Sequence, residues 1–136
     1  QLAQDGMQLI KTTPDRQLVE PIFETESDNA WCKAFEIADL ARQQQDWLLV
    51  TSIADQTLNE EIQTEDPAEY LVYIEGYAQT GSWQKSVELT NLAMSINPLI
   101  SQPLCKLWQR IDEETLDNAV KNDTLNEIYN NIACQP

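Results

Sequence analysis

The 136-residue chain contains no histidine, only eight basic residues and only three glycines. Without histidine it lacks the commonest general acid–base, the usual base of a nucleophilic triad and the imidazole ligand of many zinc sites. Three glycines and six prolines are too few for extensive β-structure with many tight turns. These scarcities argue against a histidine-based enzyme and favour a helical fold.

Basic side chains are outnumbered by 23 acidic ones, which gives a formal net charge of −15. A field of that sign repels nucleic acid and anionic membrane surfaces, so neither is an expected partner. No apolar run approaches the ~20 residues that span a bilayer, so we expect no membrane insertion by this chain. The acidity is typical of a solubilising surface, and attraction of a basic partner remains the alternative.

Residues 66–98 predict a complete helix–turn–helix hairpin. Asp66 suits an N-cap, Pro67 suits the first helical position, and Glu69 can complete a capping box. Apolar residues then recur at three- and four-residue spacing: Tyr70, Tyr73, Ile74 and Tyr77. Gly81 ends this helix, since glycine tolerates the left-handed backbone of a helix C-terminus.

The second helix of this hairpin is predicted to start at Trp83, with Ser82 as its cap, and to end at Asn97-Pro98. A second unit of the same kind precedes the hairpin. In that unit Asp46 is predicted to cap a helix that starts at Trp47 and runs to about Gln63. A helix from about Ala30 to Gln44 would complete the earlier hairpin. The two Trp residues stand 36 positions apart, at 47 and 83. Both are expected to pack in the core between the helices of their hairpins.

The last hairpin is irregular. We expect a helix over residues 101–113, a polar connector over 115–122 and a final helix opened by the capping box Thr124–Glu127. The spacing of Gly81-Ser82-Trp83, Ala93 and Asn97-Pro98 resembles a tetratricopeptide repeat. That resemblance implies an all-α fold, a short right-handed α-solenoid of tetratricopeptide-like hairpins with an irregular C-terminal one.

The domain organisation is expected to be simple. Residues 1–28 fit either a weak helical stripe or a loose hairpin, and we interpret them as a lead-in that caps the helical domain at residues 29–136. Because the chain starts at Gln1 rather than at an initiator methionine, we expect a fragment or a mature form.

Three blocks of residues resemble something more specific, the soluble C-terminal domain of bacterial multi-pass membrane proteins of the mannosyltransferase-like glycosyltransferase type. The resemblance spans about residues 20–112, and its more specific parts are Trp31-Cys32 and Leu104-Cys105. The blocks are Trp31-Cys32 with residues 38–43 and 46–47; residues 74–78 with Gly81 and Trp83; and Leu104-Cys105 with Leu107-Trp108 and Arg110. The resemblance implies a domain on the extracytoplasmic face of a bacterial membrane, with the transfer chemistry in a membrane portion outside this chain.

A partner-binding face follows from the repeat resemblance, because the first helix of each hairpin lines the groove of such a solenoid. By position, that face is expected to present Phe35, Asp39, Arg42, Gln43, Leu71, Glu75 and Gln79. Its mixed apolar and polar character suits an extended peptide or the loop of a partner protein. The alternative is that so short a groove is covered by residues 1–28.

The three cysteines lack the spacing of zinc or redox motifs. They can be small buried hydrophobes, or some can pair in an oxidising compartment. Antiparallel packing of the last two helices would bring Cys105 near Cys134, so we predict a disulfide between them and a buried free thiol at Cys32. Such a bond favours an extracytoplasmic location.

Acidic clusters at residues 60–61, 65–66 and 112–114 lack the alternation of a calcium loop and are interpreted as solvated surface. We therefore expect no catalytic residue, metal or cofactor in this chain. The favoured function is a non-catalytic interaction or scaffold domain of a membrane glycosyltransferase-like protein, bound to an unidentified protein or peptide. The alternative is a free-standing cytoplasmic tetratricopeptide adaptor.

Overall fold

A computed structural model describes residues 27–134, with side chains from Ala30 onward. Within that range the chain forms α-helices and short 3₁₀ turns and no β-strand, so the all-α prediction is confirmed there. The α-helices are α2 (Ser27–Gln43), α3 (Trp47–Asn59), α4 (Leu71–Gln79), α5 (Trp83–Ile96), α6 (Ser101–Glu114) and α7 (Ala119–Ile132). The 3₁₀ turns η2 (Pro67–Tyr70) and η3 (Pro98–Ile100) lead into α4 and α6. The expected lead-in lies outside the described residues, except that its last two residues begin α2.

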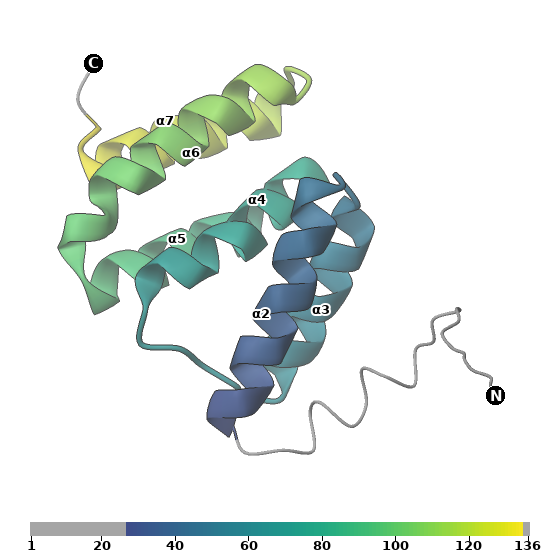
Figure 1. The fold of residues 1–136 in the computed structure, drawn as a ribbon. Helices are drawn as coiled ribbons and strands as arrows, with labels where there is room; N and C mark the ends of the chain where they lie inside the picture. The colour runs from purple at the N-terminus through teal and green to yellow at the C-terminus, as the bar shows by residue number, and fades with distance from the viewer. Residues whose placement is uncertain (1–26, 135–136) are drawn as a thin grey trace, which may run out of the picture.

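Consecutive helices fold into three pairs, which Figure 1 shows as α2 with α3, α4 with α5, and α6 with α7. Helix α4 lies in the middle, where it contacts α2 and α3 of the first pair and α6 of the last. Helix α5 also contacts α7. The central pair therefore joins the first pair to the last.

The turns within the first two pairs follow from local sequence. Asp46 caps α3, because its carboxylate accepts a hydrogen bond from the Leu49 N–H at 3.2 Å. Gly81 adopts a φ of 84°, the left-handed conformation that ends α4. Ser82 stands at the N-cap position of α5 as predicted, but its hydroxyl makes no capping hydrogen bond. The predicted cap is therefore correct in position and wrong in chemistry.

Aromatic side chains fill the core between the pairs. Trp31 of α2 packs edge-on against Tyr70 and Tyr73, with ring centroids 5.2 and 5.6 Å apart. Trp108 of α6 is fully buried, and its indole N–H donates to the Thr90 hydroxyl of α5 at 3.0 Å. These contacts join the first pair to the second and the second to the third.

The two tryptophans that follow N-caps are not equally buried. Trp83 is 8% exposed and belongs to the core, as expected. Trp47 is half-buried and packs against the edge of the core. The expectation of equivalent core packing is therefore too strong for Trp47.

Helix α4 approaches α3 closely at Gly76. A Cβ atom added at this glycine would fall on the Val50 side chain, which is itself fully buried. The absence of a side chain at residue 76 therefore sets the distance between these two helices.

Glu69 does not complete the predicted capping box. Asp66 caps η2 alone, since its carboxylate accepts from the Ala68 N–H at 3.0 Å. The Glu69 carboxylate instead accepts from the indole N–H of Trp31 at 2.6 Å and from the Thr64 hydroxyl at 2.7 Å. It therefore ties the segment between α3 and η2 to helix α2.

Two helix boundaries differ from prediction. Helix α3 ends at Asn59 rather than near Gln63, and Glu61, two residues further on, has a left-handed φ of 58°. Helix α7 begins at Ala119, inside the expected connector, and Asn118 caps it by accepting from the Lys121 N–H at 2.8 Å. Thr124 is an interior helical residue, whose hydroxyl donates to the Val120 carbonyl at 2.8 Å. The predicted Thr124 capping box is therefore wrong.

Lys121 ties the first turn of α7 to the end of α6. Its side chain has no exposed surface, and its ammonium donates to the main-chain carbonyls of Asp112 and Thr115, each at 2.8 Å. It also lies 3.1 Å from the carboxylates of Asp112 and Asp117. Burial alone would lower the pKa of Lys121, but the hydrogen bonds and charges of the two aspartates outweigh it and raise that pKa. The ammonium therefore stays charged and closes the end of α6.

Candidate functional site

The predicted partner-binding face divides between helices α2 and α4. On α2, Asp39 and Arg42 form an ion pair at 2.9 Å, and the Gln43 amide donates to the other oxygen of the same carboxylate at 3.2 Å. Phe35 and Leu71 are half-buried and pack against the core. The α2 part of the face is therefore a linked polar group together with the partly exposed Phe35, and Leu71 lies at the start of α4.

Glu75 of α4 is engaged by α6. Its side chain is 4% exposed and accepts two hydrogen bonds from the guanidinium of Arg110, at 2.9 and 3.2 Å. The hydrogen bonds to Glu75 raise the pKa of Arg110 above its ordinary value. Because the Arg110 side chain remains 47% exposed, the pair keeps one charged edge at the surface.

Gln79, one turn further along α4, also reaches α6. Its amide donates to the Glu114 carboxylate at 3.0 Å, at an exposed position. The α4 residues of the predicted face thus bridge to α6 across 35 positions of sequence. The structure therefore adds Arg110 and Glu114 to this face. Sequence reasoning missed both, because nothing in the local pattern shows which helix lies beside α4.

A disulfide joins Cys105, near the start of α6, to Cys134, just after α7. This is the pair favoured from the sequence. Cys32 is a free thiol, but it is exposed on α2, so its predicted burial is wrong. The neighbouring Trp31 occupies the inward position instead, with 3% exposure.

A polar cluster that the sequence did not reveal lies between α3, α4 and α5. The Tyr77 hydroxyl donates to the Asp55 carboxylate at 2.5 Å, and the Lys85 ammonium donates to the same oxygen at 3.1 Å. Burial raises the pKa of Tyr77, and the bond to Asp55 raises it further. Burial alone would raise the pKa of Asp55, but its bonds to Tyr77 and Lys85 lower it. The phenol therefore stays protonated and the carboxylate charged, an arrangement that holds three helices together.

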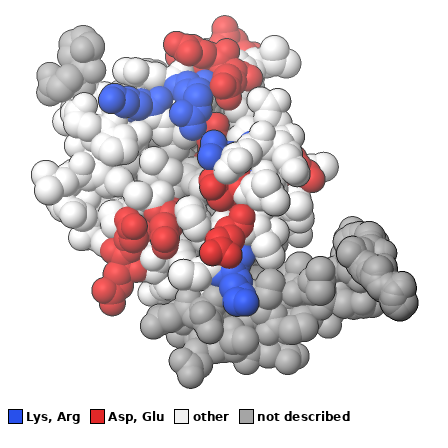
Figure 2. Space-filling model, viewed as in Figure 1, with Lys and Arg blue, Asp and Glu red and all other residues white. Residues whose placement is uncertain are grey.

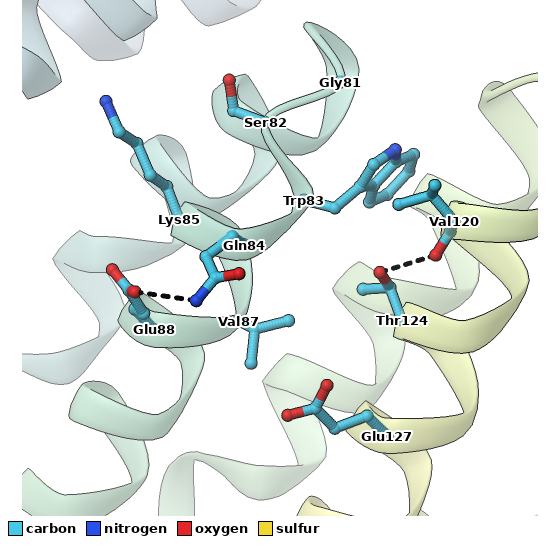
Figure 3. A pocket seen from close by; sticks show the side chains of 10 residues that line it. All are labelled: Gly81, Ser82, Trp83, Gln84, Lys85, Val87, Glu88, Val120, Thr124 and Glu127. Atoms are coloured by element: carbon cyan, nitrogen blue, oxygen red, sulfur yellow. Dashed lines mark hydrogen bonds between the residues drawn. The ribbon is translucent and has the colours of Figure 1, made fainter.

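The surface is hollowed between α5 and α7 by a space of about 590 Å³. We call this the α5–α7 groove, formed by Trp83, Val87 and Glu88 of α5 and by Val120, Thr124 and Glu127 of α7. Figure 3 shows Trp83 and Val87 directed toward the α7 side chains, whereas Lys85 points away from them. A second hollow of about 390 Å³ adjoins it and shares Gly81 and Trp83. It also includes Leu116 and Glu114.

Across residues 27–134, no three His, Cys, Asp or Glu side chains are grouped closely enough to hold a metal ion. None of the helices in that range is both long and apolar enough to cross a membrane. On the face of the molecule in Figure 2, acidic side chains form several separate groups, and basic side chains lie beside some of them. No family model, curated protein or solved structure matches the chain.

Proposed function

We propose that this chain is a non-catalytic protein-interaction domain with a tetratricopeptide-like arrangement, which binds a peptide or partner loop across α2, α4 and α6. The observation that carries the proposal is the placement of α4 against both α2 and α6, the first helices of the other two pairs. The residues proposed to form this face are polar, such as Arg42, Gln43 and Arg110, together with the partly exposed Phe35 and Leu71. A mixed lining of this kind suits main-chain and side-chain recognition of an extended segment.

The repeat-like arrangement has support from local features. Trp47 and Trp83 each follow an N-cap residue; Trp47 is half-buried against the core, and Trp83 is buried with its ring centroid 6.4 Å from that of Trp108 in the next pair. The second hairpin ends at Asn97, whose side chain accepts from the Leu99 N–H at 3.0 Å as Pro98 starts the next element. We infer a short right-handed solenoid from this succession.

We place this domain in the extracytoplasmic C-terminal part of a membrane glycosyltransferase-like protein. The disulfide between Cys105 and Cys134 supports an oxidising compartment, because such bonds are rare in the cytosol. The alternative is a free-standing cytoplasmic adaptor. Alkylation of the chain taken from its native cells separates the two, since one reactive thiol supports the first and three support the second.

A peptide-selection experiment tests the interaction function. Peptides selected from a random library on the oxidised chain are expected to shift NMR signals of α2, α4 and α6. The Arg42→Glu substitution is expected to weaken the binding of these peptides about tenfold. Lys33→Glu is the matched control. Lys33 precedes Phe35 by two residues, about 200° around the helix, so its side chain lies on the opposite side of α2 from the proposed face. Selected peptides that map to other helices, or that bind both variants equally, would contradict the proposal.

A further inference from the structure

The α5–α7 groove combines a concave shape with apolar side chains, some of which the described chain leaves partly or largely uncovered. Val120 is 60% exposed, and Leu116, in the adjoining hollow, is 88% exposed. Trp83 lies at the junction of the two hollows and Val87 is half-buried beside it. Burying such surface against a partner is favourable in proportion to the apolar area removed from water.

The rim of the groove is acidic. Glu88 and Glu127 line it from opposite helices, and Glu114 lines the adjoining hollow. Lys85 is the basic residue in the lining, and its ammonium is paired with Asp55 at 3.1 Å, on the side away from α7. Among the described residues, Glu127 has no ion-pair partner. The charge that faces an incoming partner is therefore negative.

The shape of the groove fits a short helix. Trp83 and Val87 are four residues apart on α5, and Val120, Thr124 and Glu127 follow at four- and three-residue spacing on α7. Each row thus runs along one helix face, and the α7 row is about 10 Å long at 1.5 Å per residue. A groove of that length between two helices accommodates about two turns of an amphipathic helix.

We propose that the α5–α7 groove binds a basic amphipathic helix of a partner protein, with apolar residues against Val87 and Val120 and Lys or Arg residues beside Glu88 and Glu127. Charge complementarity selects this occupant. A second copy of the chain would bring another formal charge of −15 to the same surface, and anionic lipid would also be repelled. The groove lies on the second helices of the hairpins, so this inference does not depend on the face proposed above.

Two designed helical peptides of equal length provide the probe, one built from Leu and Lys and its counterpart from Leu and Glu. Titration calorimetry is expected to detect binding of the Leu–Lys peptide alone, weakening as NaCl is raised from about 0.05 to about 0.5 M. NMR shifts of the ¹⁵N-labelled chain should cluster on residues 83–88 and 116–127.

Val120→Asp and Glu127→Gln are the decisive variants, expected to weaken binding about tenfold and a few-fold, respectively. Val120 stands at the second position of α7 and is largely exposed, so an aspartate there is compatible with the helix N-terminus and with folding. The matched controls are Leu99→Asp, at an 83% exposed leucine, and Glu65→Gln, at an exposed loop position. Neither control residue lines the groove, and neither should alter binding.

Three results would overturn the proposal. The first is equal binding of the Leu–Glu peptide, and the second is a set of NMR shifts confined to other helices. The third is equal weakening by the groove and control variants, which would mean that the Leu–Lys peptide recognises overall charge. Concentration-dependent dimerisation that is abolished by Val120→Asp would instead identify a second copy as the occupant. Because these variants avoid α2 and α4, failure here leaves the proposed function to its own test.

Discussion

Trp83 and Trp47 stand at equivalent positions after N-caps, but they differ in burial, and this difference can be measured. Trp83→Ala is expected to cost about 3–5 kcal/mol in the free energy of unfolding, as for other aromatic core truncations. Trp47→Ala should cost about half as much, because this side chain is only half-buried. Urea denaturation of both variants tests the ranking, and a larger loss at Trp47 would contradict it.

Tyr73 and Tyr77 provide a second pair with contrasting hydroxyls. Among the described residues, the buried Tyr73 hydroxyl makes no hydrogen bond of good geometry, its polar neighbour Thr57 donating instead to the Ile53 carbonyl, whereas the Tyr77 hydroxyl donates to Asp55. Tyr73→Phe should therefore leave stability unchanged or raise it, and Tyr77→Phe should lower it by about 1–2 kcal/mol. Thermal or urea unfolding distinguishes them, and a clear loss at Tyr73 would indicate a partner for its hydroxyl.

Gly76 is the position where an apparently favourable helix substitution should fail. Alanine is the better helix former by about 1 kcal/mol in an isolated helix. At Gly76, however, the added methyl group would overlap Val50, so Gly76→Ala should lower the unfolding free energy by about 1–3 kcal/mol. The double variant with Val50→Ala should recover part of that loss, and urea denaturation of the set measures the coupling.

At the scale of elements, the Cys105–Cys134 disulfide tethers the end of α7 to the start of α6. It closes a loop with a sequence separation of 29 residues, so its removal should cost about 3–4 kcal/mol on the chain-entropy model. Amide exchange after reduction should accelerate most in α7, because that helix lies within the closed loop. Exchange that rises equally in α2 and α3 would show that the bond stabilises the whole chain rather than this pair.

The helices themselves were predictable, whereas the polar contacts between them were not. The stripe Tyr70, Tyr73, Ile74 and Tyr77 was identified from its spacing and is buried. Glu69 and Thr124 each fit a local capping rule, but their side chains bond elsewhere, Glu69 to Trp31 across 38 positions. Glu75 was assigned to a free face, yet it pairs with Arg110. Local capping rules predict where a helix begins and ends, whereas the long-range partners of these side chains depend on which helices become neighbours.

The same limit applies to α7. A lysine within a polar run is ordinarily solvated, so burial of Lys121 could not be predicted from the local sequence. Its burial becomes favourable only after α6 brings the Asp112 carbonyl and carboxylate to the same place. The burial of Lys121 therefore follows from tertiary structure, whereas the start of α7 has a local cap at Asn118 in place of the expected Thr124.

At the scale of the whole molecule, alkaline pH should unfold the chain. Burial raises the pKa of Tyr70, Tyr73 and Tyr77 above the ordinary value of 10.0, so the folded state retains protons that the unfolded state loses. Their stabilising contribution is complete below pH 10 and decreases as pH rises toward the folded pKa values. Phenolate absorbance should therefore rise together with the loss of helical circular dichroism. Ionisation of all the tyrosines before any helix is lost would contradict this account.

Lys121 also has a consequence for how the molecule depends on its surroundings. In many loops a gathering of carbonyls and carboxylates is held by a bound metal ion, which must be captured from solution and can be removed by a chelator. Here the neutralising charge is attached to the chain four positions after Asp117, one of the acids that it serves. A covalently attached counter-ion keeps a high effective concentration however dilute the medium becomes. The positive charge that closes the junction between α6 and α7 is thus a side chain of the protein itself, and this closure is independent of the supply of metal ions.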